Sequence, residues 1–122
     1  MHIVDLTLEH AVPITEFHSR AAHAQPLGDG HGEAHVYAVH LAAGGHIGPH
    51  PAGFGQVFCA MAGVGWVAGA DGVRHELRTG QAAIIARGEL HAKGSETGLT
   101  ALLVQIADLT TTPHSPAAEL GR

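Results

Sequence analysis

His46 and His50 are the side chains of the central segment whose type and spacing suggest chemistry. Neutral imidazoles bind transition metals, and two histidines four residues apart form a metal-binding pair when they lie on one face of a helix. Gly45, Gly48 and Pro49 disfavour a helix here, so we expect an extended segment. Alternate residues of a regular strand lie on one side, so His46 is expected to face the same cavity as His50. The alternative places His46 at the mouth of the domain, solvated or hydrogen-bonded.

Motifs for several other chemistries are absent from the sequence. It contains no GXSXG nucleophile elbow, no phosphate-binding loop ending in GK[ST], and no GXGXXG between a strand and a helix. Glu33 and Asp71 are the acids nearest the central segment, so it lacks the paired carboxylates of glycoside hydrolases. Cys59 is the only cysteine, which excludes an internal disulfide and a thiolate zinc cluster.

The elements that must position these histidines are short strands. Apolar runs separated by turn residues predict six or seven of them, as in a sandwich or barrel. The expected strands cover residues 34–41, 56–61, 65–68, 73–77, 82–86 and 99–106, with an edge strand near 2–6. Asp71-Gly72 between two runs predicts a hairpin turn. Residues 14–22 are expected to be a helical turn or irregular.

The alternation of residues 56–60 predicts which side chains enter the cavity. Phe58 and Ala60 share the parity of Gln56, so the cavity wall near Gln56 is expected to be apolar. Cys59 has the opposite parity and is expected to point away, as an inert core residue rather than a nucleophile. Trp66 is expected to fill the core, with a place in the pocket lining as the alternative.

The spacing of glycines and histidines resembles the motifs of the cupin superfamily of small β-barrels. The first motif, G(X)5HXH(X)3-4E(X)6G, is matched by Gly44, His50 and Gly63, with Gln56 at the glutamate position. The second motif, G(X)5PXG(X)2H(X)3N, is matched by its glycines and by His91. The resemblance covers about residues 34–106 and implies an all-β fold of the cupin type, a double-stranded β-helix similar to a jelly roll.

The sequence departs from these motifs at four positions. Ala52 stands at the second histidine, Gln56 at the glutamate, Ala86 at the proline and Ser95 at the asparagine. Of the four usual metal ligands, three histidines and one glutamate, the resemblance therefore leaves His50 and His91, with Gln56 substituted. This set is neutral and is expected to bind a divalent ion more weakly than one containing a carboxylate.

Composition narrows the range of partners. Six Lys and Arg against 11 Asp and Glu give a net charge of −5, so a nucleic-acid partner is not expected. Residues 34–70 carry no Asp, Glu, Lys or Arg, but their histidines, prolines and glycines make a membrane span implausible. The acidic N-terminal stretch does not resemble a secretory signal, so a cytoplasmic protein is expected. The family resemblance implies a homodimer formed through an edge strand or one sheet face.

Two functional hypotheses follow for one domain with an N-terminal arm at 1–32, a barrel at 33–106 and a C-terminal tail at 107–122 that is mobile or a short helix. In the first, a divalent transition metal (Fe, Mn, Ni or Zn) is held by His50, Gln56 and His91, with His46 as a fourth ligand, and it serves an oxygenase, isomerase or lyase acting on a small organic molecule. In the second, a metal-free pocket binds or senses a small metabolite through hydrogen bonds from His50, Gln56 and His91. No residue is assigned as a general base, so catalysis itself stays open.

Overall fold

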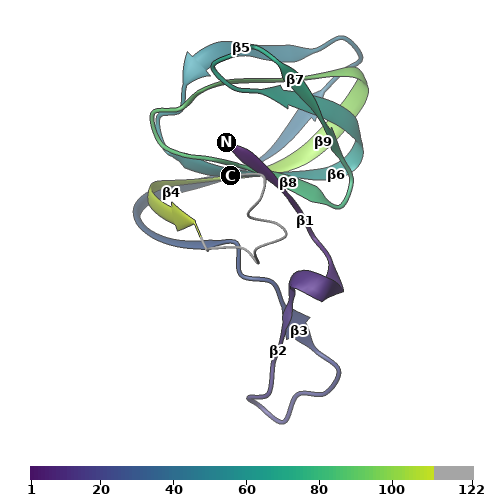
Figure 1. Ribbon diagram of the computed structural model, residues 1–122, viewed down its shortest axis with the longest axis vertical. Helices are drawn as coiled ribbons and strands as arrows, with labels where there is room; N and C mark the ends of the chain where they lie inside the picture. Colours follow the sequence, from purple (N-terminus) through teal and green to yellow (C-terminus); the bar gives the residue numbers. More distant parts are fainter. Residues whose placement is uncertain (112–122) are drawn as a thin grey trace.

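The computed structural model describes residues 1–111, which form a twisted antiparallel barrel with one small hairpin outside it (Figure 1). Its elements are β1 (His2–Asp5), the 3-10 turn η1 (Leu8–His10), β2 (Val12–Pro13), β3 (His23–Ala24), β4 (Gly28–Leu41), β5 (His46–Pro51), β6 (Gly55–Ala68), β7 (Arg74–Arg78), β8 (Gln81–Ile85) and β9 (Leu90–Thr111). The expected all-β fold is confirmed. No helix in this part of the chain is long and apolar enough to cross a membrane.

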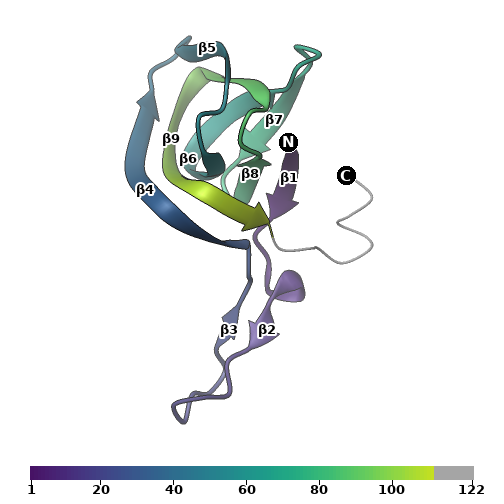
Figure 2. The same cartoon turned by 90° about the vertical axis from the view of Figure 1, so that its left-hand side faces the viewer.

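The seven barrel strands are hydrogen-bonded in the order β1-β8-β6-β9-β4, with β5 paired to β9 and β7 paired to β6. Strands β6 and β9 hold the barrel together because each pairs with different partners along its length. The first half of β6 pairs with β8 and its second half with β7, while β9 runs beside β4, β5 and β6. Figure 2 shows β4 at the outer edge of the sheet, beside β9.

Two apolar clusters lie on opposite faces of the sheet. The interior cluster is built on Phe58 and Ala60 together with residues of β7, β8 and the second half of β9. The second cluster contains Val57 and Ile84, with Cys59 packed against it. The opposite fates of Phe58 and Cys59 confirm the predicted alternation along β6. Burial raises the pKa of the Cys59 thiol, as expected for an inert residue.

The turns lie where glycine and aspartate predict them. The β6–β7 hairpin turns at Asp71-Gly72, where Gly72 has a φ of 73° and an oxygen of the Asp71 carboxylate accepts a hydrogen bond from the Val73 amide at 3.0 Å. Residues 14–22 form the irregular loop of the β2–β3 hairpin, in which Phe17 and His18 have positive φ values, and not a helical turn. Figure 1 shows this hairpin projecting from the barrel.

The strands extend beyond the expected barrel of residues 33–106. The main sheet includes β1 and begins again at Gly28, so the N-terminal arm contributes to it, and β9 continues to Thr111. The first five residues of the expected tail are therefore strand, and residues 112–122 lie outside the described part of the chain. The segment 90–98 is also strand, although Gly94 and Gly98 suggest turns. Gly94 is tolerated in β9 because the Trp66 ring occupies the space where its side chain would be, with Cζ2 2.2 Å from an added Cβ.

Candidate functional site

His50 and His91 lie side by side at one end of the barrel. They are directly opposed in the register of β5 and β9, and their ring centroids are 4.5 Å apart. His91 is fully buried, while His50 is exposed at the rim. The structure thus brings together two imidazoles that are 41 positions apart in the sequence, and their pairing follows from the antiparallel alignment of the two strands.

His91 is a buried polar side chain that lacks a hydrogen-bond partner in the part of the chain that the structure describes. Neither Nδ1 nor Nε2 has a hydrogen-bond partner within the described residues. Burial, the nearby Lys93 charge and His50 together lower the pKa of His91 to about 4, so its ring is neutral at pH 7. A neutral imidazole carries one donor and one acceptor, and both are available here.

His50 has a defined tautomer. Its Nδ1 lies 2.8 Å from the backbone carbonyl oxygen of Gly48, which can only accept, so Nδ1–H is the donor. This bond leaves Nε2 as the unprotonated acceptor of the neutral ring. The backbone of β5 therefore fixes both the orientation and the tautomer of the exposed imidazole.

Gln56 and Lys93 form a buried polar pair inside the barrel. Both side chains are only 2% exposed, and Lys93 Nζ donates a hydrogen bond to Gln56 Oε1 at 2.7 Å. Nζ also lies 4.8 Å from the centroid of the Phe58 ring, which stabilises its positive charge. Burial lowers the pKa of Lys93 from 10.5 to about 8, so the ammonium form still predominates at pH 7. Lys93 is the only lysine of the chain, and lysines are almost never buried without a reason.

His46 does not join this group. Between Ile47 and His50, three steps along β5 are matched by two along β9, from Lys93 to His91, so β5 contains one extra residue. Such a bulge reverses the faces of the strand. His46 is opposed to Gly94 and lines a hollow with Trp66 and Arg74 on the outer face, whereas His50 shares the inner face with His91.

Trp66 likewise lies outside the interior cluster, contrary to the expectation that it fills the core. It is half-buried and forms part of the outer hollows, because its neighbour Val67 takes the inward position and is completely buried. Ala52, at the position of the missing second histidine, is buried and adds no ligand.

The donor set does not fit a tightly bound divalent metal. Within residues 1–111 no three His, Cys, Asp or Glu side chains are grouped so that they could hold a metal ion. The third expected ligand, Gln56, already accepts a hydrogen bond from Lys93, and the ammonium places a positive charge beside the site. Two neutral imidazoles next to a buried cation leave the charge of a divalent ion uncompensated.

Lys93 was absent from the residues that the sequence singled out, although a signal for it exists. His91, Lys93 and Ser95 occupy alternate positions, so a strand beginning at Leu90 would place all three on the same face. All three are buried. Ser95 serves the backbone, since its Oγ donates to the Val64 carbonyl oxygen at 2.6 Å, and the site residue that the sequence reasoning missed is Lys93.

The fold is similar to that of several solved structures. A conserved protein of unknown function from Streptococcus pyogenes has a TM-score of 0.57 and 20% identity over 62% of this chain and 66% of that one, so the match spans just under two thirds of its length. A cupin-2 domain-containing protein from Shewanella frigidimarina has a TM-score of 0.53 and 18% identity over 60% of this chain and 70% of that one.

An archaeal structure is similar over a larger share of the chain. An RmlC-like cupin family protein with a double-stranded β-helix fold, from Methanocaldococcus jannaschii, has a TM-score of 0.58 and 9% identity over 80% of this chain and 89% of that one. No protein-family model matches the sequence, and no curated protein does. At such identities the likeness concerns the fold.

Proposed function

We propose, from the premise that this chain has the cupin fold, that the interior of its barrel binds a small anionic molecule and does so without a metal. The observation that carries the proposal is the buried Lys93 ammonium. Its one hydrogen bond to a protein group within residues 1–111 is to the neutral carboxamide of Gln56. Burying a charge beside a neutral amide and an aromatic ring has a large free-energy cost, and a ligand of opposite charge would compensate it.

The neighbouring histidines supply the other contacts that such a ligand needs. A carboxylate accepts several hydrogen bonds, and Lys93 has two further N–H donors beyond the one used by Gln56. His91 offers one N–H donor, since neither of its ring nitrogens has a hydrogen-bond partner among residues 1–111. His50 Nε2, at the rim, is an acceptor and suits a hydroxyl or protonated group of the ligand. The set therefore favours a small oxygen-rich organic acid.

A divalent transition metal on His50 and His91 is the second candidate, and one observation favours it. Histidines that bind metals commonly donate their other ring N–H to a backbone carbonyl, as His50 does to Gly48. Two observations disfavour the metal: the site offers few metal-binding donors, and the Lys93 ammonium places a positive charge beside it. The two candidates predict opposite effects of the lysine, because an ammonium attracts an anion and repels a dication.

The test uses the single lysine as a reporter. Protein with 13Cε-labelled lysine, prepared without chelator or affinity tag, is titrated with acetate and with neutral acetamide at constant ionic strength. The one lysine resonance is expected to shift with acetate, and the pKa of Lys93 to rise from about 8 toward its ordinary value. Lys93→Met is expected to abolish acetate binding measured by calorimetry.

Metal analysis of the same preparation completes the experiment. Less than about a tenth of an equivalent of transition metal is expected. A stoichiometric metal that both His50→Ala and His91→Ala lose would overturn the proposal in favour of the metal centre. Equal responses of the lysine resonance to acetate and acetamide would also overturn it.

A further inference from the structure

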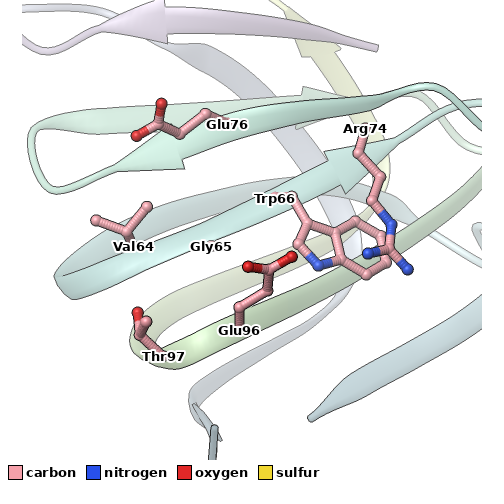
Figure 3. Close-up of a pocket in the computed structure, with 7 residues that line it drawn as sticks. All are labelled: Val64, Gly65, Trp66, Arg74, Glu76, Glu96 and Thr97. Carbon is pink, nitrogen blue, oxygen red and sulfur yellow. The ribbon is translucent and has the colours of Figure 1, made fainter. Parts of the chain in front are cut away.

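The outer face of the barrel carries two hollows that share one pair of side chains. Trp66 lies in a row with Gly94 and His46 across β6, β9 and β5, on the face opposite His91 and Lys93. Hollows of about 290 Å³ and about 270 Å³ are both lined by Trp66 and Arg74. Figure 3 shows the Arg74 guanidinium stacked against the indole of Trp66, with Glu96 and Thr97 on the neighbouring turn of β9.

The Arg74 side chain is stacked on Trp66 but has no anionic partner among the described residues. Its guanidinium carbon lies 3.9 Å from the Trp66 ring centroid, a stacked arrangement that leaves the N–H groups at the guanidinium edge available. Its neighbour Glu76 pairs with Arg78 at 3.1 Å, and Arg87 lies 3.7 Å from Asp108. Within residues 1–111 Arg74 makes no ion pair. Its guanidinium N–H donors are therefore held in one orientation and remain available to an anionic ligand.

The two hollows differ in charge. The first is lined by Glu76 and Glu96 beside Arg74, so its acids repel an anion. The second is lined by His46 together with Ile47, Pro49 and the small residues of β6 and β9, and it contains no acid. An anionic group next to Arg74 is therefore favoured on the His46 side, where the His46 imidazole can donate a hydrogen bond.

We propose that this second hollow, between β5 and the β6–β7 hairpin, is a binding site for a small carboxylic acid with an apolar body. The carboxylate would take the fork of Arg74 and a hydrogen bond from His46, and the apolar body would lie against Ile47, Pro49 and the indole of Trp66. The volume of about 270 Å³ lies near the lower end of the usual range for ligand sites, which suits a molecule with a single ring. The site is separate from the barrel interior.

Trp66 is the only tryptophan of the chain, so its fluorescence reports on the outer hollows that it lines and not on the barrel interior. The probes are benzoate and its neutral isostere benzamide, titrated at constant ionic strength. Benzoate is expected to change the emission in a saturable way, with benzamide at least about tenfold weaker because it lacks the charge. The absence of saturable change up to about 10 mM benzoate would overturn the proposal.

Two matched variants test the role of the guanidinium. Arg74→Gln is expected to weaken benzoate binding by about tenfold or more, whereas Arg78→Gln, which removes a guanidinium paired with Glu76 outside the hollow, should leave the affinity unchanged. Because the loss of Arg74 also unstacks Trp66, His46→Gln, which changes a residue lining only the second hollow, serves as a second variant and should weaken binding. Unchanged affinity in both Arg74→Gln and His46→Gln would overturn the proposal. The proposed function of the barrel interior is tested separately, by the Lys93 resonance. Failure of the outer site and failure of the interior site can therefore be told apart.

Discussion

The buried lysine makes the stability of the protein depend on pH in a defined direction. The pKa of Lys93 is lowered by burial from 10.5 to about 8 in the folded chain. Below pH 8 both folded and unfolded chains carry the charge, so the full cost of burying it is present. Between pH 8 and 10.5 the folded chain loses this proton first, and because the unfolded state then binds more protons, stability rises with pH.

The size of the rise follows from the shift. At about 1.4 kcal/mol per pKa unit, the lowered pKa corresponds to about 3 kcal/mol between pH 8 and 10.5. Lys93→Met keeps an unbranched chain of similar length beside Phe58 but carries no charge, so it should lack this rise. At pH 7 the variant gains stability because no charge is buried. It also loses stability, by about 1–3 kcal/mol, because the Gln56 oxygen has lost its hydrogen-bond donor.

The measurement is urea unfolding of wild type and Lys93→Met from pH 7 to pH 11, followed by the fluorescence of Trp66. Cys59 acts in the opposite direction, because a raised thiol pKa makes the folded state less stable above pH 9. It packs on the other face of the sheet and contributes equally to both proteins, so the difference between their unfolding free energies isolates Lys93. Parallel pH curves for the two proteins would refute the reasoning.

Three further predictions concern other parts of the barrel. His91 should stay neutral down to about pH 4, and stability should fall as pH decreases from 6.5 through 4 because the unfolded chain takes up the proton first; imidazole NMR titration checks this, and a midpoint near 6.5 contradicts it. Gly94→Ala should displace the Trp66 ring, cost about 1–3 kcal/mol and alter its emission, whereas Gly48→Ala, with open space around its Cβ, should not move the emission. If the chain is the expected homodimer and uses the exposed face of edge strand β4, Val36→Glu should yield monomers in light scattering; an unchanged mass excludes that face.

The fold and the pair of imidazoles could be predicted from the sequence because turn glycines, strand alternation and motif spacing are local patterns. Turn glycines at regular intervals indicated the strands, and the resemblance to the cupin motifs implied that His50 and His91 meet. The alternation along β6 likewise placed Gln56 and Phe58 inside and Cys59 outside. The inference along β6 needs only a strand of regular period, whereas the pairing of the two imidazoles needed the family resemblance.

The residues placed differently depend on information that no local pattern contains. His46 lies on the outer face because β5 has an extra residue, and the position of a bulge depends on how β9 is aligned beside it. Lys93 was missed because Gly94 and Gly98 are turn signals that obscure the strand character of the first half of β9. The place of Gly94 in that strand depends on the ring of Trp66, which is 28 residues away in the sequence. A buried charge is also disfavoured by every rule based on composition.

The extra residue in β5 gives one short strand two separate uses. His46 and His50 are four residues apart, yet they belong to opposite sides of the wall, one with the tryptophan and the other with the buried lysine. Removing one residue between them would restore the regular alternation, and because the two histidines would then be three residues apart, they would still lie on opposite faces, with the later imidazole opposed to His91. A single-codon deletion in this segment would therefore straighten β5 while keeping one imidazole on each side of the wall, whereas losing the bulge without shortening the chain would turn one of them to the other side.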